Sequence, residues 1–436
     1  MTATDGQGGP AMVSPGTGSI DGPAPAPLGP VLYNPFEPGY TEDPYPQFAL
    51  LREADPVHES MAGPWILFRY DDVQRLLRDA SLSVEDDRAA REGPRAELFE
   101  QVLGDGDPER RQRGARAMLN VDPPDHTRLR RLVSKAFTPR MIEGLRPLVE
   151  RLVDEALDRV APSGRMDVIA DLAFPLPFTV ISELLGMPDG DRDAIRGWSH
   201  AIVKTLDPVI TEAEVREAFE ASDAMTDHIA GVLEWKRAHP ADDLLTALIR
   251  AEEGGDRLTP DELRDQVVLL FIAGHETTVN LIGNATLALL RHPDQLARWR
   301  DDPGLDANAV DELLRYDAPV QFSRRITVAP LDVAGRTIPA GTFVLAGLAS
   351  SNRDPAFWGP TADQLDLARP TAAQHLSFGS GTHFCLGAAL ARLEGQVAIG
   401  RLIRRFADLA VADPGPAWNG RINLRGLDRL PVTFRS

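Results

Sequence analysis

Cysteine is nearly absent from this sequence, because Cys385 is the only one among 436 residues. A single thiol cannot form an internal disulfide, which excludes the disulfide framework of many secreted proteins. Basic residues are also in deficit, with 46 Lys and Arg against 65 Asp and Glu and a formal net charge of −19. Nucleic-acid binders need clustered basic groups for phosphate contacts, so this balance argues against a nucleic-acid partner.

The first thirty residues lack the pattern of a targeting segment. Asp5 and Asp21 are their only charged side chains, and no basic start precedes an apolar run. Gly, Pro, Ala, Ser and Thr dominate, which predicts a disordered tail over residues 1–30. We expect residues 31–436 to form a single domain of a cytoplasmic protein that does not enter a membrane.

The patterns along the chain predict a mainly α fold with small β-sheets. Helical periodicity recurs between residues 123 and 315, whereas residues 326–349 are β-branched runs broken by Gly and Pro, as in hairpins. Residues 422–434 read as another pair of strands. Residues 85–116 are rich in charge and poor in apolar side chains, so they are either exposed surface or a segment that covers a substrate.

One helix is predicted to be unusually long. Thr259, Pro260 and Glu262 form a helix start with a capping box, and the next stop signal is Pro293. A helix of about thirty residues spans roughly 45–50 Å at 1.5 Å per residue, enough to cross the molecule. Polar side chains interrupt its apolar run, and they would be costly within lipid, so we do not expect a membrane span.

The stretch "AGHETT" lies in the middle of that helix. Ala273 and Gly274 remove bulk from one face, so that a flat ligand or another backbone can approach. Glu276 and Thr277 place an acid beside a hydroxyl, which suits a proton relay into a buried site. The alternative is a hydroxyl that bonds to a preceding carbonyl and bends the helix. His275 points either toward such a site or away into a polar groove, and we favour the second.

The single cysteine stands in "FGSGTHFCLG", directly before a helical pattern. Cys385 is therefore expected at a helix N-terminus, where the helix dipole and free N–H groups stabilise a thiolate. Gly379 and Gly387 permit tight turns around the sulfur. The thiolate is either a nucleophile, with His383 as a nearby base, or a metal ligand. Zinc would usually need several Cys and His ligands, whereas a single thiolate suits haem iron.

A haem carries two propionates, and four residues are candidate donors to them. His126 and Arg130 are four residues apart and share a helical face. Arg325 and His383 are the other two. Taken alone, the first pair would more often be a solvated helix face.

Glu312 and Arg315, in "DELLRY", have the spacing of a helical ion pair. An exposed pair of this kind contributes only a few tenths of a kcal/mol. Arg369, in "DLARP", could join them and form a buried network.

Together these residues resemble a cytochrome P-450, a haem-thiolate monooxygenase of the soluble bacterial kind. The resemblance runs from about Tyr33 to the end and rests on "AGHETT", "ELLR", "NRDPAFW" followed by "DLARP", and "FGSGTHFCLG". It implies a single prism-shaped fold whose long central helix crosses a haem b bound by the Cys385 thiolate. It makes Glu276 and Thr277 the catalytic pair that delivers protons to dioxygen. It assigns cofactor contacts to His126, Arg130, Ala273, Gly274, Arg325, Phe378, Gly379, His383, Cys385 and Gly387, and a structural role to Glu312, Arg315 and Arg369.

The resemblance also implies a reaction and its partners. One oxygen atom from O2 would enter a small organic substrate by hydroxylation or epoxidation, in secondary metabolism. Electrons would come from a ferredoxin and an NAD(P)H-dependent ferredoxin reductase, docking near Arg128, Arg131 and Lys135 of a monomeric protein. A peroxide-driven peroxygenase and a non-catalytic haem or ligand-binding protein stay open as alternatives. The Glu276–Thr277 pair argues against both, because neither needs to protonate dioxygen.

Overall fold

The computed structural model of the protein describes residues 31–90, 94–103, 114–188, 192–253 and 256–435. The predicted tail lies outside these residues, as does part of the charged segment expected between 85 and 116.

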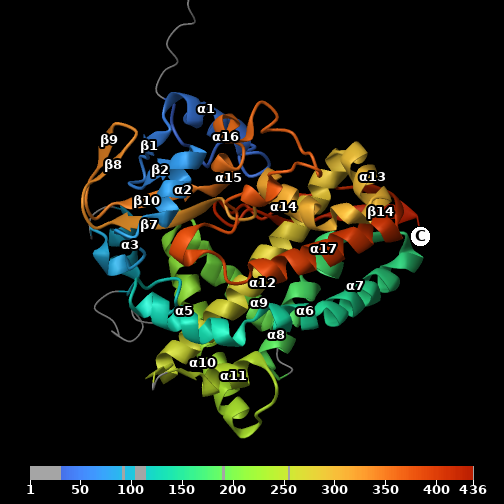
Figure 1. Ribbon diagram of the computed structural model, residues 1–436, viewed down its shortest axis with the longest axis horizontal. Helices are drawn as coiled ribbons and strands as arrows, with labels where there is room; N and C mark the ends of the chain where they lie inside the picture. Colours follow the sequence, from blue (N-terminus) through green and yellow to red (C-terminus); the bar gives the residue numbers. More distant parts are fainter. Residues whose placement is uncertain (1–30, 91–93, 104–113, 189–191, 254–255, 436) are drawn as a thin grey trace, which may run out of the picture. The chain divides into compact units, whose positions relative to one another are not determined.

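Residues Leu32–Ser436 form one compact unit, which is built mainly from helices (Figure 1). Its α-helices are α1 Tyr45–Ala54, α2 Tyr70–Arg78, α3 Pro94–Leu103, α5 Asp125–Ala136, α6 Pro139–Gly144, α7 Arg146–Val160, α8 Pro175–Leu185, α9 Arg192–Val203, α10 Glu212–Ala238, α11 Leu244–Arg250, α12 Pro260–Arg291, α13 Pro293–Asp301, α14 Asp306–Tyr316, α15 Leu348–Ser351, α16 Pro355–Trp358 and α17 Ala388–Arg405.

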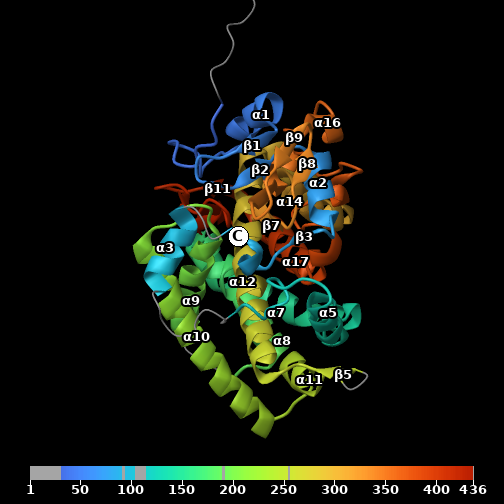
Figure 2. The same cartoon turned by 90° about the vertical axis from the view of Figure 1, so that its left-hand side faces the viewer.

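The longest helix, α12, is the one that the sequence predicts. It has 32 residues, begins with the capping box of Thr259 and Glu262, and ends just before Pro293. In Figure 2 it runs through the middle of the unit, with α5 and α7 on one side and α9 and α10 on the other. By length and composition α12 could cross a membrane, but it packs inside the protein against α8, α10, α14 and α17. It is therefore a core helix, as expected.

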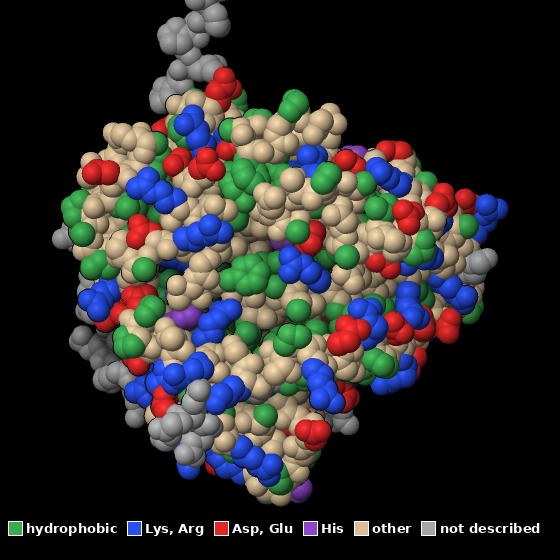
Figure 3. Space-filling view, viewed as in Figure 1, with side chains coloured by type: hydrophobic (Ala, Val, Ile, Leu, Met, Phe, Trp, Pro, Cys, Tyr) green, Lys and Arg blue, Asp and Glu red, His purple; other side chains and the backbone are tan. Residues whose placement is uncertain are grey.

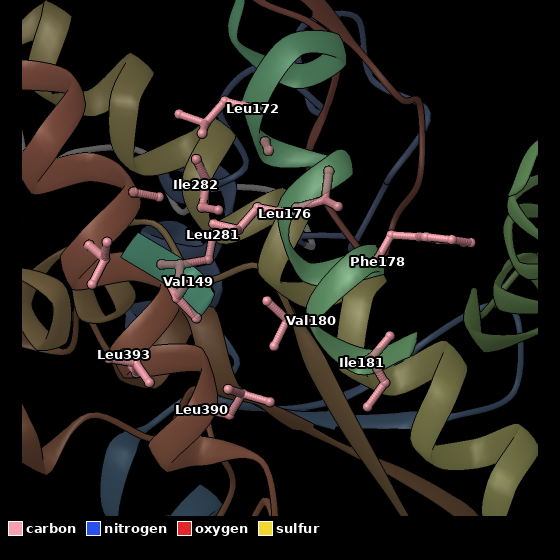
Figure 4. Packing of buried hydrophobic residues seen from close by; sticks show 14 of the residues in the cluster. Val149, Leu172, Leu176, Phe178, Val180, Ile181, Leu281, Ile282, Leu390 and Leu393 are labelled. Atoms are coloured by element: carbon pink, nitrogen blue, oxygen red, sulfur yellow. The ribbon is translucent and has the colours of Figure 1, made fainter. Parts of the chain in front are cut away.

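The main hydrophobic core lies where α8, α12 and α17 meet. Figure 4 shows Leu176 of α8, Leu281 of α12 and Leu393 of α17 converging there, with Val149 of α7 beside them. These four side chains are between 0% and 4% exposed. Each buried side chain of this size contributes about 1.5–3 kcal/mol. The core fixes the helix that carries "AGHETT" against the helix that follows the cysteine.

The strands form small sheets, which confirms the predicted fold class. They are β1 Val57–Glu59, β2 Trp65–Leu67, β3 Leu82–Ser83, β4 Arg165–Asp167, β5 Glu252–Glu253, β6 Asp256–Arg257, β7 Phe322–Thr327, β8 Leu331–Val333, β9 Arg336–Ile338, β10 Phe343–Gly347, β11 Ala407–Val411, β12 Ala417–Trp418, β13 Leu427–Arg429 and β14 Pro431–Arg435.

The largest sheet has the strand order β1-β2-β10-β7-β3, with β2 and β10 parallel and the other neighbours antiparallel. It brings the early and late parts of the chain side by side, at the upper left of Figure 1. The strand pair expected over residues 422–434 is wrong in its partners. β13 pairs with β12, whereas β14 pairs with β11 and β4, because only Leu430 separates β13 from β14 and one residue cannot form a hairpin turn.

Candidate functional site

Cys385 lies in the loop that leads into α17, just before the N-cap residue Gly387. Its backbone N–H donates to the Phe378 carbonyl at 2.9 Å, and the N–H groups of Gly387 and Ala388 donate to its sulfur. The predicted place at a helix N-terminus is thus confirmed. Phe378 packs beside this loop, with the Arg392 guanidinium 4.7 Å from the centre of its ring.

Two glycines give the cysteine loop its path. Gly379 and Gly381 have φ angles of +71° and +72°, a region that other residues rarely adopt. A Cβ at Gly381 would also lie 2.7 Å from the Leu77 carbonyl oxygen at the end of α2. The loop can therefore pack against α2 only with glycine at that position.

The sulfur is held in surroundings that favour a bound cation. Burial raises the pKa of the Cys385 thiol, although the Gly387 N–H group and the charges of Arg130 and Arg392 lower it. The net direction is upward, so the helix terminus alone does not keep a thiolate at neutral pH. A metal ion bound to the sulfur would supply the missing positive charge, since a coordinating thiol is deprotonated outright.

His126, His383, Arg130 and Arg325 gather near the cysteine from three elements. The rings of His126 and His383 are 4.2 Å apart between centroids. Arg130 donates to the Phe384 carbonyl at 2.7 Å, beside Cys385. His126 is only 1% exposed, yet neither of its ring nitrogens has a hydrogen-bond partner among the residues that the structure describes. Buried polar groups are normally paired, so these nitrogens point to a ligand.

The buried basic side chains of this cluster favour the binding of an anion. Burial and the charges of His126, Arg325 and Arg130 lower the pKa of His383 to about 3. Burial lowers the pKa of Arg325 to about 10, and Asp122 only partly offsets it. The Asp122 carboxylate already accepts hydrogen bonds from Ser83 and the Val84 N–H. The cluster therefore fits a group with two carboxylates whose metal binds the nearby sulfur, as a haem requires.

The middle of α12 changes character at the predicted residues. Ala273 is exposed and Thr277 is half-buried, whereas most of the surrounding helix is buried. The Thr277 hydroxyl donates to the Ala273 carbonyl at 3.0 Å, which is the helix-bending bond considered as an alternative. A Cβ at Gly274 would lie 3.1 Å from Ile181 of α8. Its small size thus admits α8, and its contact with the cofactor stays a prediction.

Glu276 points to a different place from Thr277. Its carboxylate accepts a hydrogen bond from Arg421 at 3.1 Å and lies 4.0 Å from Nδ1 of His200. Arg421 was not predicted as a partner of Glu276, because it is 145 residues away in an irregular segment with no local motif. His275 faces away from Ala273, as favoured, but it lies among aromatic rings rather than in a polar groove. Its Nδ1 bonds to the Phe271 carbonyl at 2.8 Å.

The predicted ion network of α14 is present and buried. Arg315 donates to both oxygens of Glu312, at 2.7 and 2.8 Å, and both residues are 0% exposed. Arg369 donates to the same carboxylate at 3.2 Å. The three residues hold α14 against the segment that precedes the cysteine loop.

The positive charges expected to receive a redox partner are partly engaged within the protein. Arg128 makes a close ion pair with Glu262 of α12 and another with Asp256 at 3.4 Å. Arg131 lies 3.9 Å from the same Asp256 carboxylate. Arg128 therefore fastens α5 to the start of α12, and docking of a partner at this helix stays a prediction.

Comparison with known proteins gives one family. The family model described as "Cytochrome P450" matches residues 104–302 and 305–413. The chain is 43% identical over 410 residues to "Cytochrome P450 107B1" of Saccharopolyspora erythraea, covering 91% of this chain and 96% of that protein. It is 42% identical over 406 residues to "Cytochrome P450 monooxygenase PikC" of Streptomyces venezuelae, covering 91% and 92%.

Solved structures agree with this result. The Bacillus subtilis polyketide synthase cytochrome P450 PksS has a TM-score of 0.81 and 36% identity, covering 93% of this chain and all of that one. The myxobacterial cytochrome P450 CYP267B1 in complex with myristic acid has a TM-score of 0.83 and 37% identity, covering 92% and 99%.

Proposed function

The chain belongs to the cytochrome P450 family, and from this premise we propose that it is a ferredoxin-dependent monooxygenase that oxidises a small organic substrate in bacterial secondary metabolism. Its cofactor is haem, bound through the Cys385 thiolate. When bound, the haem supplies the chemistry that activates dioxygen, and thiolate ligation favours O–O cleavage. We propose that the protein is monomeric and cytoplasmic.

The donors around the cysteine hold the cofactor in this proposal. His126, His383, Arg130 and Arg325 bind the propionates, and Phe378 packs beside the sulfur. The Gly387 and Ala388 N–H groups donate to the sulfur and moderate its charge. The observation that carries the proposal is the state of His126, which is buried beside His383. Within the described part of the chain, neither ring nitrogen of His126 has a hydrogen-bond partner.

Thr277 and Glu276 handle protons in this proposal. Thr277 presents its hydroxyl on the less buried face of α12, next to Ala273. Glu276 keeps its carboxylate in a charged pocket on the same turn of the helix. Rotation of the Thr277 hydroxyl away from the Ala273 carbonyl would free it to donate toward the active site.

The names of the relatives support the proposed substrate class. Among them are a "6-deoxyerythronolide B hydroxylase", a "Vitamin D(3) 25-hydroxylase" and the polyketide biosynthesis cytochrome P450 PksS. Two of these names give hydroxylation as the reaction, and the third gives polyketide biosynthesis as the setting. We propose a substrate of similar chemistry, a secondary metabolite that becomes hydroxylated or epoxidised.

The face that carries α5 supports docking of an acidic ferredoxin. Lys and Arg side chains gather over α5 on this face (Figure 3). We propose that α5 meets the partner through Arg131 and Lys135, alongside Arg128. Arg131→Glu and Lys135→Glu should slow reduction by ferredoxin and leave reduction by dithionite unchanged. Equal effects on both would refute this surface.

The test of the proposed function has two stages. The ferric protein is titrated with a metabolite panel while the haem band is followed for a shift from low to high spin. Compounds that shift it are then incubated with ferredoxin, reductase and NADPH. We expect oxygenated product that depends on all three. Product formed only with added peroxide would favour the peroxygenase, and ligand binding without turnover by either route would favour a binding protein.

A further inference from the structure

A small polar cavity lies beside α12, on the side to which Glu276 points. Its volume is about 20 Å³, and its polar lining includes Arg196, His200, Glu276, Asn280, Arg421 and Asp428. A cavity of ~10–15 Å³ or more can hold one water if polar partners surround it. The cavity joins α9 to α12 and to the segment around β13.

The two oxygens of the Glu276 carboxylate have different neighbours in this cavity. Oε2 accepts a hydrogen bond from Arg421 at 3.1 Å, and Oε1 lies 4.0 Å from Nδ1 of His200. Arg421 also donates to the backbone carbonyl of His200, at 3.4 Å. A separation of 4.0 Å is too long for a direct hydrogen bond, but one water can bridge it.

The difference in exposure between His200 and Glu276 indicates which of the two exchanges protons with solvent. The His200 side chain is 41% exposed, whereas that of Glu276 is 10% exposed. His200 can thus exchange protons with solvent, and Glu276 cannot do so as readily. His275 lies 3.7 Å from the same Oε1 atom, but its side chain is 0% exposed, so it is less suited than His200 to exchange protons with solvent.

We propose that His200 passes protons from solvent to Glu276, and that Arg421 is a positioning residue that holds the Glu276 carboxylate toward it. The inference rests on the proposed role of Glu276 and Thr277 in proton delivery. In each transfer the His200 imidazolium loses its ring proton to the cavity water, and the Glu276 carboxylate gains one. No electron moves, and the neutral imidazole then regains a proton from solvent. Glu276 passes its own proton on toward Thr277.

The charges that face His200 suit this exchange. Burial, followed by the charges of Arg421 and Arg196, lowers the pKa of His200, while the charges of Glu276 and Asp428 partly offset this by raising it. The net direction is downward, so the His200 imidazolium gives up its proton to the cavity more readily than a fully solvated histidine would.

The test compares His200→Gln with His228→Gln. His228 is the matched control, because it is a half-buried histidine of the neighbouring helix α10 and does not line the cavity. The holoenzyme is supplied with NADPH, a ferredoxin and a reductase, and the share of reduced oxygen released as hydrogen peroxide rather than water is measured. This needs no identified substrate. We expect His200→Gln to lower the rate of water formation about a hundredfold, the low end for a positioned proton donor, and to increase the solvent isotope effect on that rate. His228→Gln should match the wild type.

A second readout does not depend on turnover. Ring signals of the histidines are titrated by NMR in the ferrous carbonyl form, and His200→Gln identifies the signal of His200. Glu276→Gln removes a neighbouring negative charge, so the titration midpoint of His200 should fall. Arg421→Gln removes a neighbouring positive charge and should raise the midpoint. Arg421→Lys keeps the charge, so its midpoint should lie between those of wild type and Arg421→Gln. If the titration midpoint of His200 is the same in wild type, Glu276→Gln and Arg421→Gln, the inference is overturned.

The variants separate this inference from the proposed function. If Glu276→Gln and Thr277→Ala leave the peroxide share unchanged, the proposed relay itself fails. If they raise it while His200→Gln behaves like His228→Gln, the relay stands and the role of His200 is refuted. His200→Asn repeats the test with a second side chain, and an unchanged carbonyl spectrum verifies that each variant is folded.

Discussion

Replacing Glu312 with Gln tests most sharply how the buried ion network supports the site. The Glu312 carboxylate accepts hydrogen bonds from Arg315, Arg369 and the backbone N–H of Asp366. The amide keeps the shape of the side chain but removes its charge, and it turns one acceptor into a donor that faces guanidinium groups. Arg315 is 0% exposed, so its positive charge would stay buried without a counter-charge.

The loss in free energy of unfolding depends on the hydrogen bonds that Arg315 retains in the variant. Removal of one partner from a buried ion pair costs about 3–5 kcal/mol. Arg315 retains three carbonyl acceptors, which should place the loss at the lower end, about 3 kcal/mol. At about 1.4 kcal/mol per factor of ten, the unfolded fraction should rise roughly a hundredfold. The three carbonyls belong to Asn352, Ala362 and Gln364.

The assay is urea unfolding of the holoprotein, followed by circular dichroism and by the haem band. The control is Glu155→Gln in α7, which breaks a pair with Arg151 whose two side chains are 56% and 59% exposed. It should cost less than about 0.5 kcal/mol. If Glu312→Gln changes the free energy of unfolding by no more than this control while turnover is lost, the network is catalytic rather than structural and our reasoning is wrong.

Three further predictions follow. Thr277→Ala should raise the share of reduced oxygen released as peroxide; an unchanged share would remove this hydroxyl from proton delivery. His126→Ala removes a hydrogen bond to a charged group, so the haem dissociation constant should rise about ten- to a hundredfold, and unchanged binding would contradict the assigned propionate contact. Burial raises the pKa of Glu394 to about 8. The folded state therefore holds this proton where the unfolded state has lost it, and the stability of wild type relative to Glu394→Gln should fall as pH rises from about 4.5 to about 8. A flat difference would show that Glu394 is not held neutral.

Features set by neighbouring residues could be predicted from the sequence. The start of α12 follows from Thr259 and Glu262, whose reciprocal hydrogen bonds need only a spacing of three. The same is true of Glu312 and Arg315 within α14. Cys385 could be placed before a helix because the apolar spacing of α17 begins directly after it.

Features that depend on contacts between residues far apart in the chain could not be predicted from the sequence. Arg421 meets Glu276 only because the segment before β13 folds back over α12, and nothing local marks that arginine. Nothing local indicates that Arg128 pairs with Glu262, which is 134 residues away on α12. Glu394 looks like a surface residue of a helix rich in charge, but it lies on the face of α17 that packs against α12 and is 1% exposed.

The measurement that tests the central claim most directly is the absorption spectrum of the reduced protein with carbon monoxide. With Cys385 as ligand, the main haem band of the wild type should shift far to longer wavelength, as thiolate ligation requires, and Cys385→Ser should lose that band. A wild-type spectrum without the shift, or one that persists in Cys385→Ser, would contradict the assignment of Cys385 as the haem ligand.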